Sequence, residues 1–162
     1  MNTAAVLTIS DSCSTGERED RSGPAVAELL RQNGYEIQQR RIVADEQDEI
    51  EQALISLAQV AQLVVTTGGT GITSHDVTPE ATRAVCSKLV DGIPEKMRAE
   101  GARQTPFALL SRGLCGVCGQ ALVLNLPGSP EGASESLLAV LEILPHALDL
   151  LAGKTAHGSD EV

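Results

Sequence analysis

The stretch that decides the fold is L-V-V-T-T-G-G-T-G-I-T-S-H-D-V-T-P-E-A-T-R, residues 63–83. It opens with the apolar run Leu63–Val65, which predicts a buried strand. Three glycines follow within residues 68–71 and predict a turn. Thr78 and Pro79 then have the residue types of an N-cap and a first helical residue. The stretch therefore predicts a strand, a glycine turn and a helix start, a unit of α/β folds.

The glycine turn suits a phosphate-bearing ligand. Glycine lets a ligand approach the bare backbone, and the free N–H groups of a helix start attract anions. The turn is not a P-loop, since no lysine follows it, and Ser74 stands where the last glycine of a G-x-G-x-x-G fingerprint belongs. A tight connection that binds nothing is the alternative interpretation. Asp76, at the end of the turn, favours a ligand site.

The composition is that of one acidic domain. We expect residues 1–152 of the 162 to form it and residues 153–162 to be a flexible C-terminal tail. The net charge of -10 opposes binding to nucleic acid, which requires a basic surface. Only Tyr35 and Phe107 are aromatic, so the core must be aliphatic and platforms for stacked bases are nearly absent.

The N-terminus carries no basic region ahead of its short apolar run. No apolar run elsewhere approaches the ~20 residues of a membrane span. We therefore expect a soluble, cytoplasmic protein that does not contact a membrane.

The four cysteines are Cys13, Cys86, Cys115 and Cys118, and only the last two form a C-x-x-C pair. A zinc site needs a second pair of ligands at similar spacing, which the sequence lacks. A thioredoxin-like pair would stand between a strand and a helix, whereas this one leads into the strand-like run 120–126. We expect ordinary reduced cysteines, with a metal or redox role as the alternative.

The remaining chain alternates strand and helix patterns. We expect a doubly wound, mostly parallel sheet with an antiparallel hairpin at Cys118-Gly119 and helices on both faces, a three-layer αβα arrangement. The polar middle of residues 35–43 suggests an edge strand. The other expected strands are residues 3–9, 109–117 and 120–126; the expected helices are 24–32 with Ser22 as cap, 46–59, 79–88, 93–104, and one after Pro130 that breaks or kinks near Pro145.

Polar residues follow the predicted strands on one rim of the sheet. Ser10 and Asp11 come after the first strand, and Asp45 follows the second. In a parallel sheet these residues would share a crevice with the glycine turn. Asp45 can also be a mere cap of the helix that follows it, and the charged loop 10–23 is typical of a solvated connection.

The stretch T-T-G-G-T-G-I-T-S-H-D-V-T-P-E-A-T resembles the molybdenum-cofactor biosynthesis family of molybdopterin adenylyltransferases and gephyrin G domains. The resemblance continues through four further motifs: L-T-I-S-D-S (7–12), V-A-D-E (43–46), L-S-R (110–112) and N-L-P-G-S-P (125–130). It implies a molybdopterin-binding-domain-like α/β fold in a homotrimer or hexamer. It also implies use of ATP and Mg²⁺ to adenylylate molybdopterin, with release of pyrophosphate, before a downstream enzyme inserts molybdenum.

The same resemblance implies roles for particular residues. Asp45 and Asp76 match the acidic residues that the family uses for catalysis and around the metal. The terminal phosphate of molybdopterin, already an anion, would be the attacking group, so no base is obligatory. The residues that match the pterin and nucleotide crevice are Ser10, Asp11, Thr67, Gly68, Gly69, Thr70, Gly71, Ser111, Gly128 and Ser129, for which caps and turns are the purely structural alternative.

Two positions depart from the family pattern. His75 and Cys118 stand where relatives usually have arginine, and both changes remove fixed positive charge. The alternative function is therefore a non-catalytic paralogue that holds pterin or an assembly partner. A purely structural subunit would leave the pair Asp45 and Asp76 unexplained.

Overall fold

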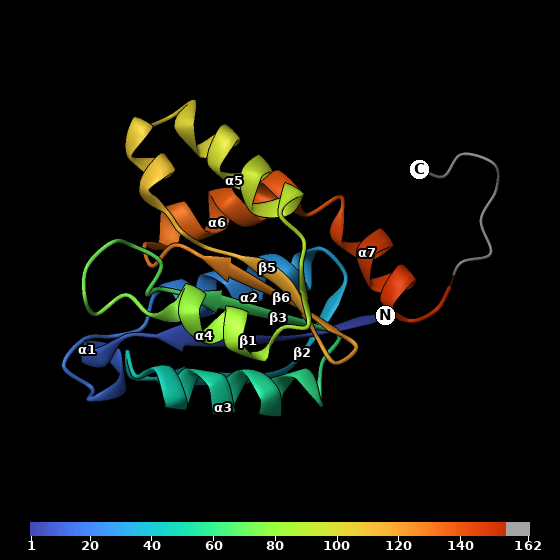
Figure 1. The fold of residues 1–162 in the computed structure, drawn as a ribbon, viewed down its shortest axis with the longest axis horizontal. Helices are drawn as coiled ribbons and strands as arrows, with labels where there is room; N and C mark the ends of the chain where they lie inside the picture. The colour runs from blue at the N-terminus through green and yellow to red at the C-terminus, as the bar shows by residue number, and fades with distance from the viewer. Residues whose placement is uncertain (155–162) are drawn as a thin grey trace.

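The computed structural model describes residues 1–154, in which a six-stranded sheet lies between two layers of helices (Figure 1). The strand order is β2-β1-β3-β6-β5-β4. The strands are β1 (Asn2–Ile9), β2 (Tyr35–Val43), β3 (Leu63–Thr67), β4 (Lys88–Leu89), β5 (Cys115–Cys118) and β6 (Ala121–Leu126). No helix of residues 1–154 is long and apolar enough to cross a bilayer.

The sheet is mixed, as the sequence predicted. β1 pairs in parallel with both β2 and β3, and β3 pairs in parallel with β6. β5 is antiparallel to β6 and to β4. All five residues of β3 are buried, which places it at the centre, whereas β2 is largely exposed at one edge. The α/β fold class and the edge position of β2 are confirmed.

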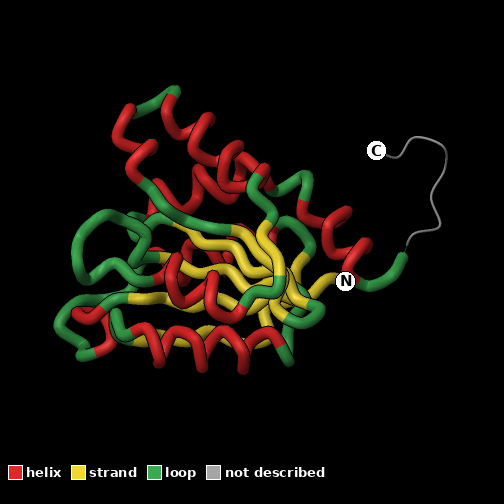
Figure 2. The backbone as a smooth tube through the Cα atoms, viewed as in Figure 1, coloured by secondary structure: helices red, strands yellow, loops and turns green. Residues whose placement is uncertain are grey.

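The helices form two layers on the sheet (Figures 1 and 2). α3 and α4 cover one face, and α2 and α6 cover the other, with α5 packed on α6. The helices are α1 (Asp11–Ser14), α2 (Ser22–Gln32), α3 (Gln47–Ala58), α4 (Thr78–Val85), α5 (Gly92–Ala102), the 3₁₀ helix η1 (Pro106–Leu110), α6 (Pro130–Val140) and α7 (Leu144–Leu151).

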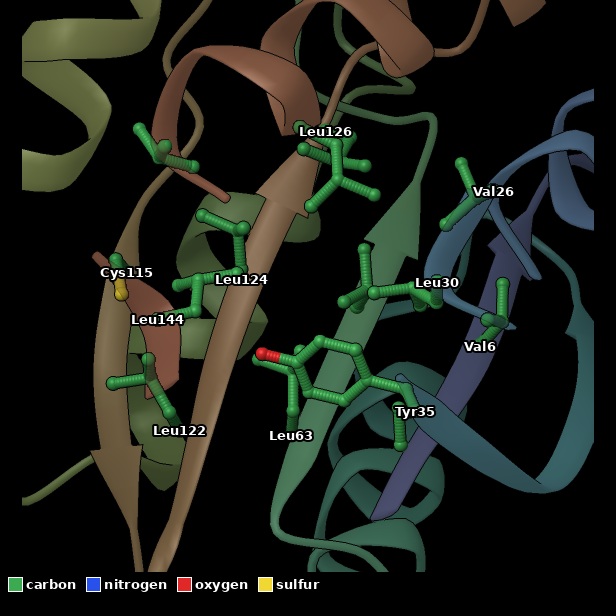
Figure 3. Close-up of a cluster of buried hydrophobic side chains, with 14 of the residues drawn as sticks. Val6, Val26, Leu30, Tyr35, Leu63, Cys115, Leu122, Leu124, Leu126 and Leu144 are labelled. Carbon is green, nitrogen blue, oxygen red and sulfur yellow. The ribbon is translucent and has the colours of Figure 1, made fainter. Parts of the chain in front are cut away.

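Successive residues of the buried strands supply opposite faces of the sheet. Val6 packs under α2 with Tyr35, whereas Leu7 packs under α3. Figure 3 shows the first of these clusters, in which Tyr35 lies among aliphatic side chains. Its buried hydroxyl has no hydrogen-bond partner among the described residues, and burial raises its pKa. Phe107 is 75% exposed, so the core is aliphatic as predicted apart from Tyr35.

Several predicted boundaries are wrong. The run 109–117 is not one strand, because Leu109 and Leu110 end the 3₁₀ helix that Pro106 begins, and β5 starts only at Cys115. The two-residue strand β4 was not predicted, since it pairs with β5 far along the chain. The predicted break near Pro145 is confirmed, because α6 ends at Val140 and α7 carries this proline in its first turn.

Two predicted caps are also wrong, as is the cap given as the alternative for Asp45, because tertiary partners take these side chains. Thr78 lies inside the first turn of α4 and its hydroxyl donates to the carbonyl of Gly68 at 2.9 Å. Ser22 lies inside α2, and the carboxylate of Asp20 accepts from the N–H of Gly23 instead. Asp45 makes no capping bond to α3. The predicted tail 153–162 falls mostly on residues 155–162, outside the described residues.

Candidate functional site

A polar cavity of about 760 Å³ opens where the parallel strands β1, β3 and β6 end. The loops after these strands meet here because their carboxyl ends lie at one edge of the sheet. Eight of the predicted site residues line the cavity: Ser10, Asp45, Thr67, Gly68, Gly69, Asp76, Gly128 and Ser129. Residues from Ser10 to Ser129 thus line one cavity, at the rim of the sheet where the sequence analysis expected them to meet.

The glycine turn needs its glycines for its own conformation. Gly68 and Gly69 have φ of 95° and 70°, values that favour glycine. A Cβ on Gly68 would collide with the carbonyl oxygen of Ile9, and a Cβ on Gly69 would collide with the hydroxyl of Thr78. The tight connection is therefore real, and it also forms one wall of the cavity.

Free backbone donors point to an anionic ligand. The N–H groups of Gly69, Gly128 and Ser129 donate to no described residue, while that of Gly68 donates to the carbonyl of Leu126. Ser129 is the N-cap of α6, and its hydroxyl accepts from the N–H of Gly132 at 3.0 Å. The first turns of α2 and α6 both contribute residues to the cavity wall. Helix N-termini and free N–H groups favour phosphate there.

Asp45 is fixed by Asp11 rather than by its helix. The Asp11 N–H donates to the Asp45 carboxylate at 3.0 Å, and the Asp45 N–H donates to the Asp11 carboxylate at 2.9 Å. Asp11 is exposed and does not line the cavity. Burial raises the pKa of Asp45; the hydrogen bond from the Asp11 N–H offsets part of this rise, and the charges of Asp11 and Asp76 add to it. A cation beside these carboxylates would relieve that repulsion.

Asp76 presents one carboxylate oxygen freely. Its Oδ2 accepts from the N–H and hydroxyl of Thr73 at 2.9 and 2.8 Å. Its Oδ1 accepts from no described residue. Thr70 and Gly71, predicted as binding residues, do not line the cavity; their carbonyl oxygens accept from Arg112. Through these hydrogen bonds, Thr70 and Gly71 help to hold the loop that carries Asp76.

Ser111 lies apart from the main cavity. It lines a neighbouring hollow of about 260 Å³ between α5, η1 and α6, and Ser129 lines both. The Ser111 hydroxyl accepts from the N–H of Gly113 at 3.3 Å. Ser111 is thus adjacent to the cavity that the other predicted residues form, but not in its wall.

The loop between β1 and α2 contributes residues that the sequence analysis assigned to a solvated connection. Arg18, Glu19, Asp20 and Arg21 all line the cavity. Asp20 anchors the loop, since its Oδ2 accepts from the hydroxyl of Thr8 at 2.7 Å. Their place in the cavity wall could have been predicted from the position of this loop, which follows a strand at the edge of the sheet where ligands bind. The two arginines supply positive charge at the cavity.

The departures at His75 and Cys118 do not alter the cavity wall. His75 is exposed and lies outside the lining. Cys118 pairs with Ala121 at the start of β6, the opposite end of the sheet from the cavity. All four cysteines are free, and burial raises the pKa of Cys115 to about 12 and that of Cys86 to about 11. No group of three or more His, Cys, Asp or Glu suited to a metal occurs within residues 1–154.

A doubly wound sheet with free backbone donors, helix N-termini and carboxylates at its strand ends defines a class: α/β domains that bind phosphate-bearing ligands. The particular family is shown by comparison with known proteins. The chain belongs to the family described as the probable molybdopterin binding domain, whose model matches residues 5–146. This confirms the resemblance that the sequence motifs carried.

Three relatives illustrate the match. A molybdopterin adenylyltransferase of Helicobacter pylori strain J99 is 44% identical over 153 residues, covering 91% of this chain and 86% of the relative. Gephyrin of Dictyostelium discoideum is 34% identical over 160 residues, covering 92% of this chain and 22% of gephyrin. The crystal structure of the molybdopterin biosynthesis enzyme MoaB from Thermus thermophilus is 46% identical, with a TM-score of 0.89, covering 94% of this chain and 98% of that one.

Proposed function

We propose that this protein adenylylates molybdopterin, with ATP as co-substrate and pyrophosphate as the second product. Two relatives named molybdopterin adenylyltransferase align with this chain over most of its length and most of their own, which supports this reaction. The observation that carries the proposal is a single cavity lined both by Asp45 and Asp76 and by the glycine turn and the α6 N-terminus, whose residues Gly69, Gly128 and Ser129 have free N–H groups. Such a cavity suits a triphosphate and a metal together.

The reaction needs no base from the protein. A terminal phosphate oxygen of molybdopterin attacks the α-phosphorus of ATP and forms a new P–O bond. The bond from that phosphorus to the bridging oxygen breaks, and its electron pair leaves with pyrophosphate. Because the attacking phosphate is already an anion near neutral pH, the protein's task is to align the phosphates and to stabilise charge on the departing group. We assign this task to the N–H groups of Gly69, Gly128 and Ser129, because these residues line the cavity and their N–H groups donate to no described residue.

The carboxylates fit Mg²⁺. This ion takes oxygen ligands and is usually held by one or two carboxylates together with substrate phosphates and waters. Asp45 and Asp76 supply such oxygens at the cavity, and the free Oδ1 of Asp76 and the raised pKa of Asp45 are consistent with a cation between them. When bound, the metal would offset the negative charge of the triphosphate. We assign Asp45 and Asp76 to holding it.

A direct assay tests the proposal. Purified protein is incubated with molybdopterin, ATP and Mg²⁺, and adenylylated pterin and pyrophosphate are both quantified. The proposal predicts equal amounts of the two products, and neither from a variant with Asp45→Asn and Asp76→Asn together. Pterin binding without either product would establish the alternative, a non-catalytic paralogue, and would refute the proposed reaction.

We also propose that the protein works as a homotrimer or hexamer that passes its product to a molybdenum-insertion enzyme. Exposed apolar side chains on η1 support an assembly surface, because Phe107, Leu109 and Leu110 are 75%, 60% and 52% exposed. Light scattering across micromolar concentrations checks the assembly, and a monomer throughout would contradict it.

A further inference from the structure

Arg112 joins the loop that carries Asp76 to the rest of the fold. Three hydrogen bonds run from this residue to the loop between β3 and α4. Its backbone N–H donates to the carbonyl of Thr70 at 2.8 Å, its Nε donates to the carbonyl of Gly71 at 2.8 Å, and its Nη2 donates to the carbonyl of Asp76 at 2.9 Å. Arg112 therefore holds both ends of the exposed segment 72–75.

Glu80 in the first turn of α4 fixes the guanidinium of Arg112. Its two carboxylate oxygens accept from Nη1 at 2.6 Å and from Nη2 at 3.2 Å. The paired hydrogen bonds lower the pKa of Glu80. Because the side chains of Arg112 and Glu80 are 37% and 46% exposed, the ion pair adds little to global stability. Its effect is geometric, because it orients the guanidinium so that Nε and Nη2 donate to the carbonyls of the loop.

The loop has few other restraints of its own. Within residues 70–76, the other hydrogen bonds are local, from Thr73 to the Asp76 carboxylate and from the Asp76 N–H to the Thr73 carbonyl. Thr70 at the start of the loop is buried, but Ile72 is 69% exposed, so the segment after Thr70 has little apolar anchoring. Thr78 closes the base of the loop, since its N–H donates to the carbonyl of Gly69 at 3.1 Å and its hydroxyl donates to that of Gly68 at 2.9 Å. Between these anchors, Arg112 supplies the only hydrogen bonds among the described residues that tie segment 70–76 to another part of the fold.

We propose that Arg112, oriented by Glu80, is a positioning residue that holds the Asp76 carboxylate at the cavity. The inference rests on the proposed function for the role of Asp76, but the restraint of the loop can be measured without it. Only arginine fits the task, because its planar fork reaches two carbonyls and a carboxylate at once, which a lysine ammonium on a flexible stem does not reproduce.

The experiment compares Arg112→Ala, Arg112→Lys and Glu80→Gln with the wild type. Arg31→Ala is the matched control, because Arg31 pairs with Glu28 on the surface of α2, away from the cavity. Hydrogen exchange of segment 70–77 reports the loop itself. Binding of Mn²⁺ with ATP, followed by electron paramagnetic resonance, reports the carboxylate without turnover. Product formation with and without added guanidinium reports the reaction.

We expect both Arg112 variants to speed exchange in segment 70–77 and to lower Mn²⁺ affinity by about 10- to 100-fold, the usual loss when a residue supporting a metal ligand is removed. Added guanidinium should partly restore Arg112→Ala but not Arg112→Lys. Glu80→Gln should show a smaller loss in the same direction, and Arg31→Ala none. Melting temperatures should fall by no more than about 4 °C in each.

Wild-type exchange in segment 70–77 of Arg112→Ala would overturn the proposal. Lost activity with unchanged exchange and Mn²⁺ binding would overturn it too, because Arg112 would then act on the substrate directly. If Arg112→Ala does not fold, Glu80→Gln and Arg112→Lys decide by the same two measurements. If the wild-type protein itself shows no adenylyl transfer while Arg112→Ala exchanges faster than wild type, the proposed function is refuted and the loop restraint stands.

Discussion

The conformation of Gly69 makes a quantitative prediction for Gly69→Ala. Alanine at φ of 70° costs about 1–2 kcal/mol relative to glycine, because its Cβ approaches the following carbonyl. The new Cβ also collides with the Thr78 hydroxyl, which donates to the buried carbonyl of Gly68 at 2.9 Å. Displacing this hydroxyl leaves that carbonyl unsatisfied and costs about 1–3 kcal/mol more. The expected total is roughly 2–5 kcal/mol.

Gly34→Ala is the matched control. Gly34 has φ of 88° and nothing within 4 Å of the added Cβ, so alanine there is destabilised only by the unfavourable backbone conformation. Urea unfolding of the two variants and the wild type gives both free energies. The variant at Gly69 should be less stable than the control by about 1–3 kcal/mol. It should also bind ATP more weakly, because the Gly69 N–H lies at the cavity.

Equal destabilisation of the two variants would refute this reasoning. It would mean that the glycine turn relaxes around the added Cβ and that the Thr78 hydroxyl keeps its bond. A destabilised Gly69→Ala with unchanged ATP affinity would confirm the steric argument and would remove the Gly69 N–H from the proposed binding site.

Four further predictions concern individual side chains. Asp76→Asn should abolish pyrophosphate release while the circular dichroism spectrum and pterin binding stay close to wild type; unchanged release would remove its assigned role. Burial raises the pKa of Asp45 above its ordinary value of 3.8, so its charge destabilises the folded state as pH rises through that value. Without Mg²⁺, Asp45→Asn should therefore be more stable than wild type near neutral pH, and urea unfolding should show the gain vanish below pH 3.8. Serine at both Cys115 and Cys118 should leave turnover within a few-fold, and elemental analysis should find no stoichiometric zinc. Wild type and His75→Ala should bind ATP alike by calorimetry at about pH 6 and 8, since His75 is exposed outside the cavity lining; a wild-type affinity that rises toward pH 6 would assign it to the anion site.

Much of the fold follows from local sequence patterns. The run Leu63–Val65, the glycines after it and the Thr78-Pro79 pair each act over a few residues, so β3, the turn and α4 were predictable with errors of only a few residues at their ends. The position of β2 at the edge was predictable because exposed positions must be polar. The rim position of Asp45 and Asp76 followed from parallel strands alone.

Long-range partners decided what the local patterns left open. Asp45 lies beside Asp11 because the parallel strands β1 and β2 end together, with Ile9 paired to Val43. Asp20 bonds to Thr8 because the loop between β1 and α2 folds back over the strand end. Nothing in the charged pattern of residues 17–21 distinguishes a cavity wall from a solvated connection.

Arg112 shows the same limit most clearly. Its side chain bonds to carbonyls 41 and 36 residues earlier in the chain, at Gly71 and Asp76. Backbone carbonyls carry no side-chain signature, so no sequence pattern marks them as the targets of an arginine. The sequence by itself determined the alternation of strands and helices, the glycine turn and the family. Only the tertiary structure decided which donors meet the loop, because those contacts depend on how strands distant in sequence pair.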